Sequence, residues 1–276
     1  MMRAGIRIIA LDLDDTLLNT RKELSERSRA ALERAAAAGI EVVPATGRFY
    51  RGIPASIQAL PFLHYAITIN GGEVRDIRSG EVLYFAEIPL ERALEMLDEL
   101  DTLPVIYDCY QEGWGWITEA MQRSAERYID YAPSLEMLRR LRTAVPELKA
   151  WLRERGRDVQ KLQVFTRDRA LRRRTLESLQ ARYPDLAVTA SLPNNIEINT
   201  AAANKGDALL ALAKALQVPR EETMAFGDGL NDLSMLRAAG VGVAMGNAYE
   251  ELKAAADRVT AGCDEDGAAR VIEELL

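Results

Sequence analysis

Residues 6–18 read Ile-Arg-Ile-Ile-Ala-Leu-Asp-Leu-Asp-Asp-Thr-Leu-Leu and place carboxylates directly after an apolar run. The run Ile6–Leu11 is interrupted only by Arg7 and is typical of a buried strand. Asp12 and Asp14 lie two residues apart, so both side chains point to the same side of a strand. Burying an unpaired charge is costly, and a hard divalent cation such as Mg²⁺ is a natural partner for carboxylate oxygens. The stretch therefore indicates metal-assisted phosphate chemistry at the end of a strand, or an acidic turn without a function.

Strands and helices alternate on the carboxyl side of this stretch. The sequence predicts a helix over Ser25–Gly39, a strand over Ile40–Ala45, a helix over Pro54–Leu60 and a strand over Tyr65–Ile69. Such alternation predicts a parallel sheet with right-handed crossovers. Polar residues follow each strand, and open α/β sheets bind ligands at that edge.

The middle of the chain follows a different pattern. Residues 73–85 resemble a hairpin with its turn at Ser79-Gly80, and further strands then lie next to strands with a few helices between them. This arrangement predicts an inserted α+β module over residues 83–192. The alternating pattern resumes at Ile196, so residues 1–82 and 193–276 are expected to form one core domain.

The predicted strand ends carry residue types suited to phosphoryl transfer. A carboxylate can attack phosphorus, a second can transfer a proton, and others can hold Mg²⁺. Thr, Asn and Lys side chains can stabilise the charge on the phosphoryl oxygens. Each feature has a simpler alternative, since an acidic glycine-rich segment can be a tight turn and a lysine can be a surface residue. The candidates are Asp12, Asp14, Thr46, Asn70-Gly71, Gly227–Asp232 and Lys205.

Four segments in the same order resemble the signatures of haloacid dehalogenase superfamily phosphatases, specifically the Cof-like subfamily with a large inserted cap. The segments are LDLDDTLL (11–18), PATGR (44–48), KGDALL (205–210) and AFGDGLNDLSML (225–236). The resemblance covers residues 5–82 and 195–276 and fades through the insertion. It implies a Rossmann-like α/β core with a parallel sheet, and an α+β cap that determines substrate specificity.

The resemblance also implies a role for individual residues. Asp12 matches the nucleophile and a metal ligand, and Asp14 matches the general acid and base whose backbone carbonyl also binds Mg²⁺. Asp228 matches an acidic metal ligand, and Asp232 supports the metal directly or through water. The residues implied at the phosphate are Thr46, Gly47, Lys205, Asn231, Asn70 and Gly71.

The resemblance implies a Mg²⁺-dependent phosphatase acting on small phosphorylated metabolites such as sugar phosphates, through an aspartyl-phosphate intermediate. A phosphomutase or phosphotransferase would use the same residues, and a sugar-phosphate sensor would bind without turnover. A receiver-type signalling module is a further alternative. Receivers are shorter, however, and carry their phosphorylated Asp on a middle strand.

Composition narrows the classes of partner. The net charge of −7 disfavours binding to nucleic acid or an anionic membrane, and no apolar run reaches 18 residues. The two cysteines, Cys109 and Cys263, lie far apart and read as reduced thiols of a cytoplasmic protein. Residues 139–174 hold thirteen Lys or Arg against four Asp or Glu. This segment is either a set of solvated helix faces or a surface that attracts phosphorylated substrates. No oligomeric state is predicted.

Overall fold

The computed structural model describes residues 5–190, 192 and 194–276, and the chain forms two compact units. The first unit comprises residues 1–85 and 202–276, and the second comprises residues 86–201. The expected domain boundary at residue 193 lies outside the described residues. Within the described ranges, every helix is too short or too polar to cross a bilayer.

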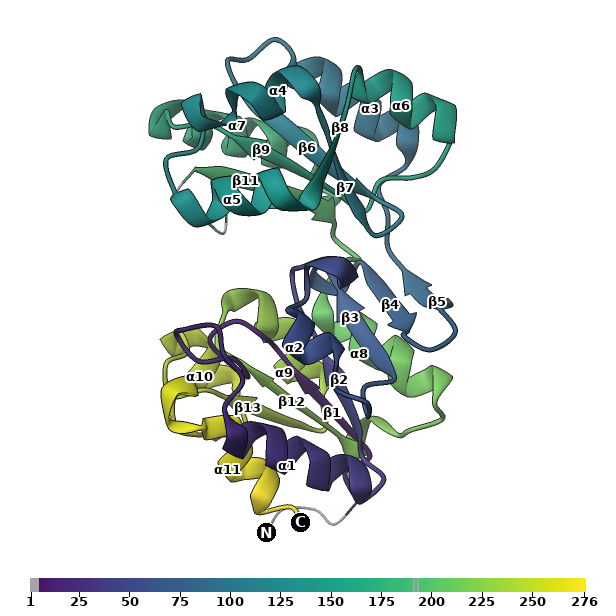
Figure 1. The fold of residues 1–276 in the computed structure, drawn as a ribbon, viewed down its shortest axis with the longest axis vertical. Helices are drawn as coiled ribbons and strands as arrows, with labels where there is room; N and C mark the ends of the chain where they lie inside the picture. The colour runs from purple at the N-terminus through teal and green to yellow at the C-terminus, as the bar shows by residue number, and fades with distance from the viewer. Residues whose placement is uncertain (1–4, 191, 193) are drawn as a thin grey trace. The chain divides into compact units, whose positions relative to one another are not determined.

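A parallel five-stranded sheet forms the centre of the first unit, as the alternating pattern predicts. Its order is β14-β13-β12-β1-β2 (Figure 1). The strands are β1 (Ile8–Leu11), β2 (Glu41–Pro44), β12 (Thr223–Gly227), β13 (Val241–Ala244) and β14 (Arg258–Val259). All four residues of β1 are buried, which explains its continuous apolar run. The chain adds β2 on one side of β1 and β12 on the other, so the strand order reverses beside β1, where open α/β sheets bind ligands.

The third predicted strand differs from expectation. Strand β3 (Tyr65–Thr68) belongs to a separate antiparallel sheet with β4 (Glu73–Asp76) and β5 (Val82–Phe85). An isolated parallel bridge between Ala45 and Ile67 links it to the segment after β2, together with backbone hydrogen bonds such as the one from the Thr46 amide to the carbonyl oxygen of Ile67. The backbone of β3 also pairs with the hairpin that follows it. That hairpin, β4 and β5, is the one expected over residues 73–85.

Short helices surround the strands of the first unit. They are α1 (Glu26–Ala37), α2 (Ala55–Gln58), α8 (Lys205–Ala215), α9 (Leu233–Ala238), α10 (Glu250–Ala255) and α11 (Gly267–Glu273) (Figure 1). Helix α8 is capped by Asn204, whose side chain accepts a hydrogen bond from the Asp207 amide. It packs so closely on α9 that a Cβ atom at Gly206 would lie 2.4 Å from the carbonyl oxygen of Ser234. This close approach fixes the helix start that carries Lys205.

The second unit is an α+β module, as expected. Its six-stranded sheet has the order β10-β11-β9-β6-β7-β8 and is antiparallel except between β7 and β8. The strands are β6 (Ile106–Gln111), β7 (Trp114–Thr118), β8 (Arg142–Val145), β9 (Lys161–Phe165), β10 (Leu186–Thr189) and β11 (Asn195–Thr200). The helices are α3 (Leu90–Leu100), α4 (Glu119–Ser124), α5 (Ala132–Leu141), α6 (Leu148–Arg155) and α7 (Arg169–Arg182).

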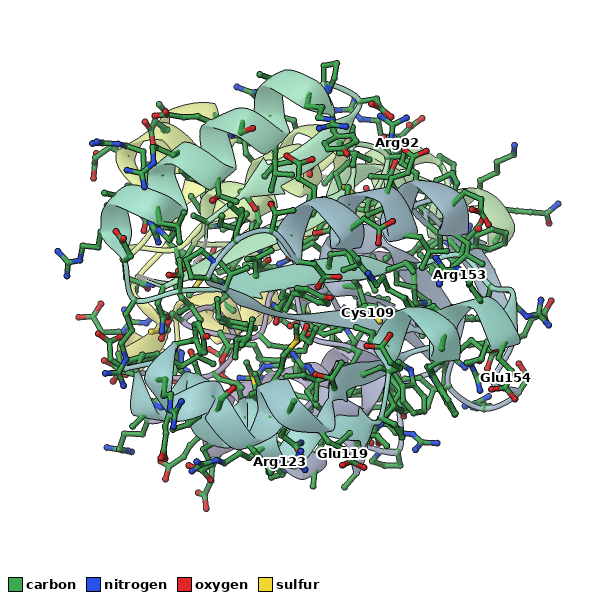
Figure 2. All side chains as sticks on the ribbon, turned by 90° about the horizontal axis from the view of Figure 1, so that it is seen from above. Arg92, Cys109, Glu119, Arg123, Arg153 and Glu154 are labelled. Carbon is green, nitrogen blue, oxygen red and sulfur yellow. The ribbon has the colours of Figure 1, made fainter. Side chains whose placement is uncertain are left out.

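Strand β11 corrects the expected boundary. Residues 195–200 were expected in the core domain, but β11 pairs with β9 and β10 of the second unit. Its alternation of polar and apolar residues suits a sheet with one apolar face. Ile196 and Ile198 accordingly lie in the apolar cluster of this unit, together with Cys109. Figure 2 shows Cys109 near the centre of the ribbons of this unit and Arg153 toward their periphery.

Candidate active site

Two adjacent strand ends bring the central carboxylates together. Asp12 follows β1 and Asp228 follows β12, and the Asp12 amide donates to the carbonyl oxygen of Phe226 at 3.0 Å. Asp232 ends the single 3-10 turn Leu230–Asp232 that follows. Asp12, Asp228 and Asp232 each offer a carboxylate oxygen, and the three oxygens lie within 4.8 Å of one another.

Lys205 neutralises part of this negative charge. Its buried ammonium Nζ donates to Oδ1 of Asp12 and to Oδ1 of Asp232, both at 2.5 Å. Burial alone would lower the pKa of Lys205, but the two carboxylates outweigh burial and raise it above its ordinary value. The lysine is therefore a permanent cation at the carboxyl end of β1.

The remaining negative charge makes this edge suited to a cation. Burial, together with the charges of Asp232 and Asp228, raises the pKa of the Asp12 carboxyl well above its ordinary value, although Lys205 opposes the shift. Burial likewise raises the pKa of Asp228 to about 6, with Asp232 and Asp15 adding to it and the Thr16 hydroxyl opposing it. One cation cannot balance three close carboxylates, and an all-oxygen donor set suits Mg²⁺.

Asp232 is the carboxylate least available to such a cation. Its Oδ2 accepts hydrogen bonds from the Asp228 amide at 3.0 Å and the Gly229 amide at 2.9 Å. Its Oδ1 accepts from Lys205. Both oxygens therefore hold the loop after β12 in place, which favours Asp12 and Asp228 as direct metal ligands.

Asp14 lies apart from the three-carboxylate cluster and is held by Arg48. Arg48 donates from Nε to Oδ2 and from Nη2 to Oδ1, each at 2.9 Å. Burial raises the pKa of the Asp14 carboxyl, but Arg48 and Lys22 outweigh burial and bring it below its ordinary value. The adjacent Asp15 has φ 64°, so the chain turns directly after Asp14.

Four of the expected phosphate-binding residues lie close together in the first unit: Thr46, Gly47, Asn70 and Asn231. Thr46 is buried, and its carbonyl oxygen accepts from the Asn70 amide at 3.0 Å. The Asn231 side chain donates to Oδ1 of Asn70 at 3.1 Å. A Cβ atom at Gly47 would lie 2.8 Å from that same Oδ1. Asn70 adopts the left-handed region with φ 57°, a strained conformation of the kind that clusters at functional sites.

The structure adds two residues that the sequence reasoning missed. Arg48 belongs to the PATGR segment, but no role was expected for it. Thr16 donates from Oγ1 to Oδ1 of Asp228 at 2.7 Å, across the two strand ends. Both contacts link residues far apart in the chain, and the signals in the sequence were the presence of Thr16 in the DLDDTLL segment and of Arg48 in the PATGR segment.

Comparisons with known proteins find similar sequences and a similar fold. A family model described as haloacid dehalogenase-like hydrolase matches residues 9–272. Phosphatase YwpJ of Bacillus subtilis is 33% identical, with 98% of this chain and 100% of the relative covered. The 5-amino-6-(5-phospho-D-ribitylamino)uracil phosphatase YcsE of the same organism is 31% identical, covering 98% and 96%. The crystal structure of a haloacid dehalogenase-like hydrolase from Bacteroides thetaiotaomicron has a TM-score of 0.85 at 30% identity, covering 98% and 100%.

Proposed function

Because this chain belongs to the haloacid dehalogenase-like hydrolases and is a phosphatase of that superfamily, we propose that it hydrolyses small phosphorylated metabolites through an aspartyl-phosphate. The observation that carries the proposal is the contact of Asp12 with the buried Lys205 at 2.5 Å, in the same carboxylate cluster as Asp228. A nucleophilic carboxylate must approach an anionic phosphate, and Lys205 reduces the repulsion between them.

The proposed reaction has two steps that exchange one proton. In the first, an oxygen of Asp12 attacks phosphorus while the Asp14 carboxyl protonates the leaving alcohol oxygen. In the second, Asp14 takes a proton from water as the water oxygen attacks phosphorus, which releases inorganic phosphate and regenerates Asp12. Thr46, Gly47, Lys205, Asn231, Asn70 and Gly71 are proposed to hold the phosphoryl oxygens.

The proposed cofactor is Mg²⁺, held by Asp12, Asp228 and the backbone carbonyl of Asp14. When bound, it would supply positive charge that screens the nucleophile from the phosphate. Asp232 is proposed to position the metal site without touching the ion, because it holds the Asp228 amide and the Lys205 ammonium in place.

The proposed substrates are sugar phosphates and similar small metabolites. One relative is named for a substrate with a phosphorylated ribityl chain, which is chemically close to a sugar phosphate. We further propose that the second unit selects the substrate, and that the protein acts in the cytoplasm. A phosphomutase would instead return the phosphoryl group to another hydroxyl of the sugar, so release of inorganic phosphate separates the two activities.

The test compares Asp12→Asn with Asp15→Asn, using phosphate release from an aryl phosphate with added Mg²⁺. We expect Asp12→Asn to abolish turnover and Asp15→Asn, three residues away and outside the proposed roles, to retain it. Removal of Mg²⁺ with a chelator should stop turnover, and readdition should restore it. Persistent activity of Asp12→Asn would contradict the assignment of Asp12 as the nucleophile. Turnover without a divalent ion would contradict the proposed dependence on Mg²⁺. A panel of phosphorylated metabolites then identifies the substrate.

A further inference from the structure

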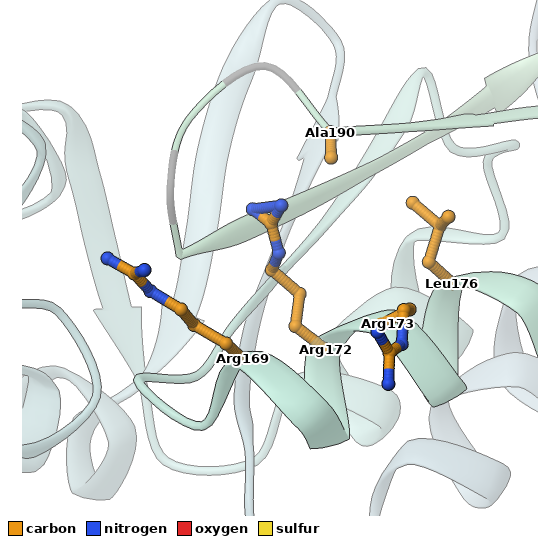
Figure 3. Close-up of a pocket in the computed structure, with 5 residues that line it drawn as sticks. All are labelled: Arg169, Arg172, Arg173, Leu176 and Ala190. Atoms are coloured by element: carbon orange, nitrogen blue, oxygen red, sulfur yellow. The ribbon is translucent and has the colours of Figure 1, made fainter.

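Helix α7 of the second unit presents an unusual set of cations at its start. Arg169, Arg172 and Arg173 line a pocket of about 370 Å³ together with Leu176 and Ala190 (Figure 3). The spacings of three and four residues place the arginines on one helix face. The five described residues that line this pocket include no carboxylate.

The energetics of the helix do not favour this placement. The amino end of a helix carries a partial positive charge, so cations there are destabilising, as are like charges three or four residues apart. The nearby Asp168 compensates only in part, because it brings one negative charge, as the carboxylate that caps the helix by accepting from the amides of Ala170 and Leu171 at 2.9 Å, against three arginines. A bound anion would relieve both repulsions.

Two of the three guanidinium groups are available to a ligand. Arg169 and Arg173 are exposed, and neither makes a hydrogen bond or ion pair with any residue that the structure describes. Arg172 is half-buried and donates from Nη1 to the carbonyl oxygen of Leu192 at 2.7 Å. That bond fixes its direction, and Figure 3 shows Arg172 pointing from α7 toward the segment that carries Ala190. A guanidinium has five N–H donors, so Arg172 keeps others for a ligand.

We propose that this pocket binds a small molecule carrying two or more phosphate groups. Each guanidinium presents paired N–H donors that suit the bidentate geometry of phosphate oxygens, which favours arginine over lysine at such sites. The volume suits a small ligand. This site lies in the second unit, uses none of the residues assigned to phosphate release, and does not rest on the proposed function.

The test measures binding of methylenediphosphonate, a non-hydrolysable diphosphate analogue, to the full-length protein by calorimetry. Divalent cations are removed on a chelating resin beforehand, so that the carboxylates of the first unit repel the probe. We expect binding of one molecule per chain, weakened at least tenfold in the double variant R169Q/R173Q. The matched control is R140Q/R153Q, which removes two exposed arginines of the same unit outside the pocket and should change the affinity less than twofold.

Any of three results would overturn the proposal. Absence of binding to the parent protein removes the site. Equal weakening in both double variants shows a general effect of charge without a defined pocket. Equally tight binding of citrate, a tricarboxylate probe, shows that phosphate is not the recognised group. Circular dichroism of each variant establishes that it is folded, and phosphate release is assayed separately, so failure of this proposal and failure of the proposed phosphatase function are distinguishable.

Discussion

Arg48 donates two hydrogen bonds of 2.9 Å to the two oxygens of the Asp14 carboxylate. Arg48 also donates from Nη1 to the carbonyl oxygen of Gly52 at 3.1 Å, which anchors the guanidinium to the chain after β2. The proposed acid of the reaction is therefore oriented by a residue from the neighbouring strand end. The same contact stabilises the ionised form of Asp14, which cannot donate a proton. Arg48 consequently influences both the position and the protonation of the group.

Replacement of Arg48 should change the pH profile of the reaction. Loss of the guanidinium removes the main influence that lowers the pKa of Asp14, so in Arg48→Gln that pKa rises. The carboxyl then stays protonated to a higher pH, so the alkaline limb of the pH profile of kcat/KM should move to higher pH. The maximal rate should fall by up to about 100-fold, because the carboxyl is less well oriented.

The control for Arg48 is Arg48→Lys, which keeps the charge but loses the paired hydrogen bonds. It should shift the alkaline limb less than Arg48→Gln does. A lower rate with an unchanged pH profile in both variants would contradict a link between Arg48 and the protonation of Asp14.

Asp228 should make metal affinity depend on pH. Its pKa of about 6 in the metal-free protein means that protons compete with Mg²⁺ below that pH. The Mg²⁺ concentration giving half-maximal activity should rise about tenfold per pH unit below about pH 6. Titrations with Mg²⁺ at several pH values measure this directly. A requirement for Mg²⁺ that is constant from pH 7 down to pH 5 would contradict it.

The stability of the metal-free protein provides an independent check on Asp228. Its folded-state pKa lies above the ordinary value of 3.8, so the folded chain binds more protons between these pH values. The stabilisation from this group is therefore present at low pH and is lost as the pH rises through about 6. Urea unfolding of the parent protein and of Asp228→Asn should show this loss in the parent only.

Thr16 should affect the pKa of the Asp228 carboxyl and therefore the affinity for Mg²⁺. In Thr16→Val the hydroxyl that donates to Asp228 at 2.7 Å is lost, so the pKa of Asp228 rises further. A hydrogen bond to a charged group contributes about 1.5–3 kcal/mol. We therefore expect Mg²⁺ affinity at pH 7 to fall about tenfold, with Thr16→Ser close to the parent protein. Equal losses in both variants would indicate a packing effect instead.

The sequence predicted the parts of the site that depend on local spacing. The apolar run before Asp12, the polar residues after each strand and the glycine-rich segment before Asp232 are all visible within a few residues. These features can be predicted because the alternation along a strand fixes the direction of the side chains at its end. The parallel sheet followed from the same alternation of strands and helices.

The parts that it missed depend on contacts between distant segments. Arg48 reaches Asp14 only because β1 and β2 are adjacent, and Thr16 reaches Asp228 only because β1 and β12 are adjacent. Strand β11 was placed in the wrong unit for a similar reason. Its pattern shows that it is a strand, but pairing with β9 and β10 decides the sheet to which it belongs.

Lys205 should be more important for folding than an ordinary lysine. Lys205→Met leaves Asp12 and Asp232 as close buried carboxylates without their cation, and such a loss costs about 3–5 kcal/mol. Denaturant unfolding measures the change. The control, Lys214→Met, alters an exposed lysine of the same helix and should change stability by less than about 0.5 kcal/mol.

A second variant keeps the Lys205 prediction testable if Lys205→Met does not fold. Lys205→Met with Asp232→Asn removes one charge of each sign, so it should be more stable than Lys205→Met alone. Equal stability of the single and double variants would contradict the energetic coupling of Lys205 with Asp232.

Gly71 should tolerate no side chain, for two separable reasons. Its φ of +93° is unfavourable for any other residue, and a Cβ atom there would lie 2.2 Å from the carbonyl oxygen of Asn204, just before Lys205. Gly80 isolates the first reason, since its φ is +77° but a Cβ atom would meet nothing within 4 Å. Gly80→Ala should therefore cost only about 1–2 kcal/mol of strain, whereas Gly71→Ala should cost about 1–3 kcal/mol more from the clash. Because the clash pushes on the start of α8, Gly71→Ala should also reduce phosphate release. Equal destabilisation in both variants would show that the backbone near Asn204 can move away freely, and that the phosphate edge is not held rigidly against α8.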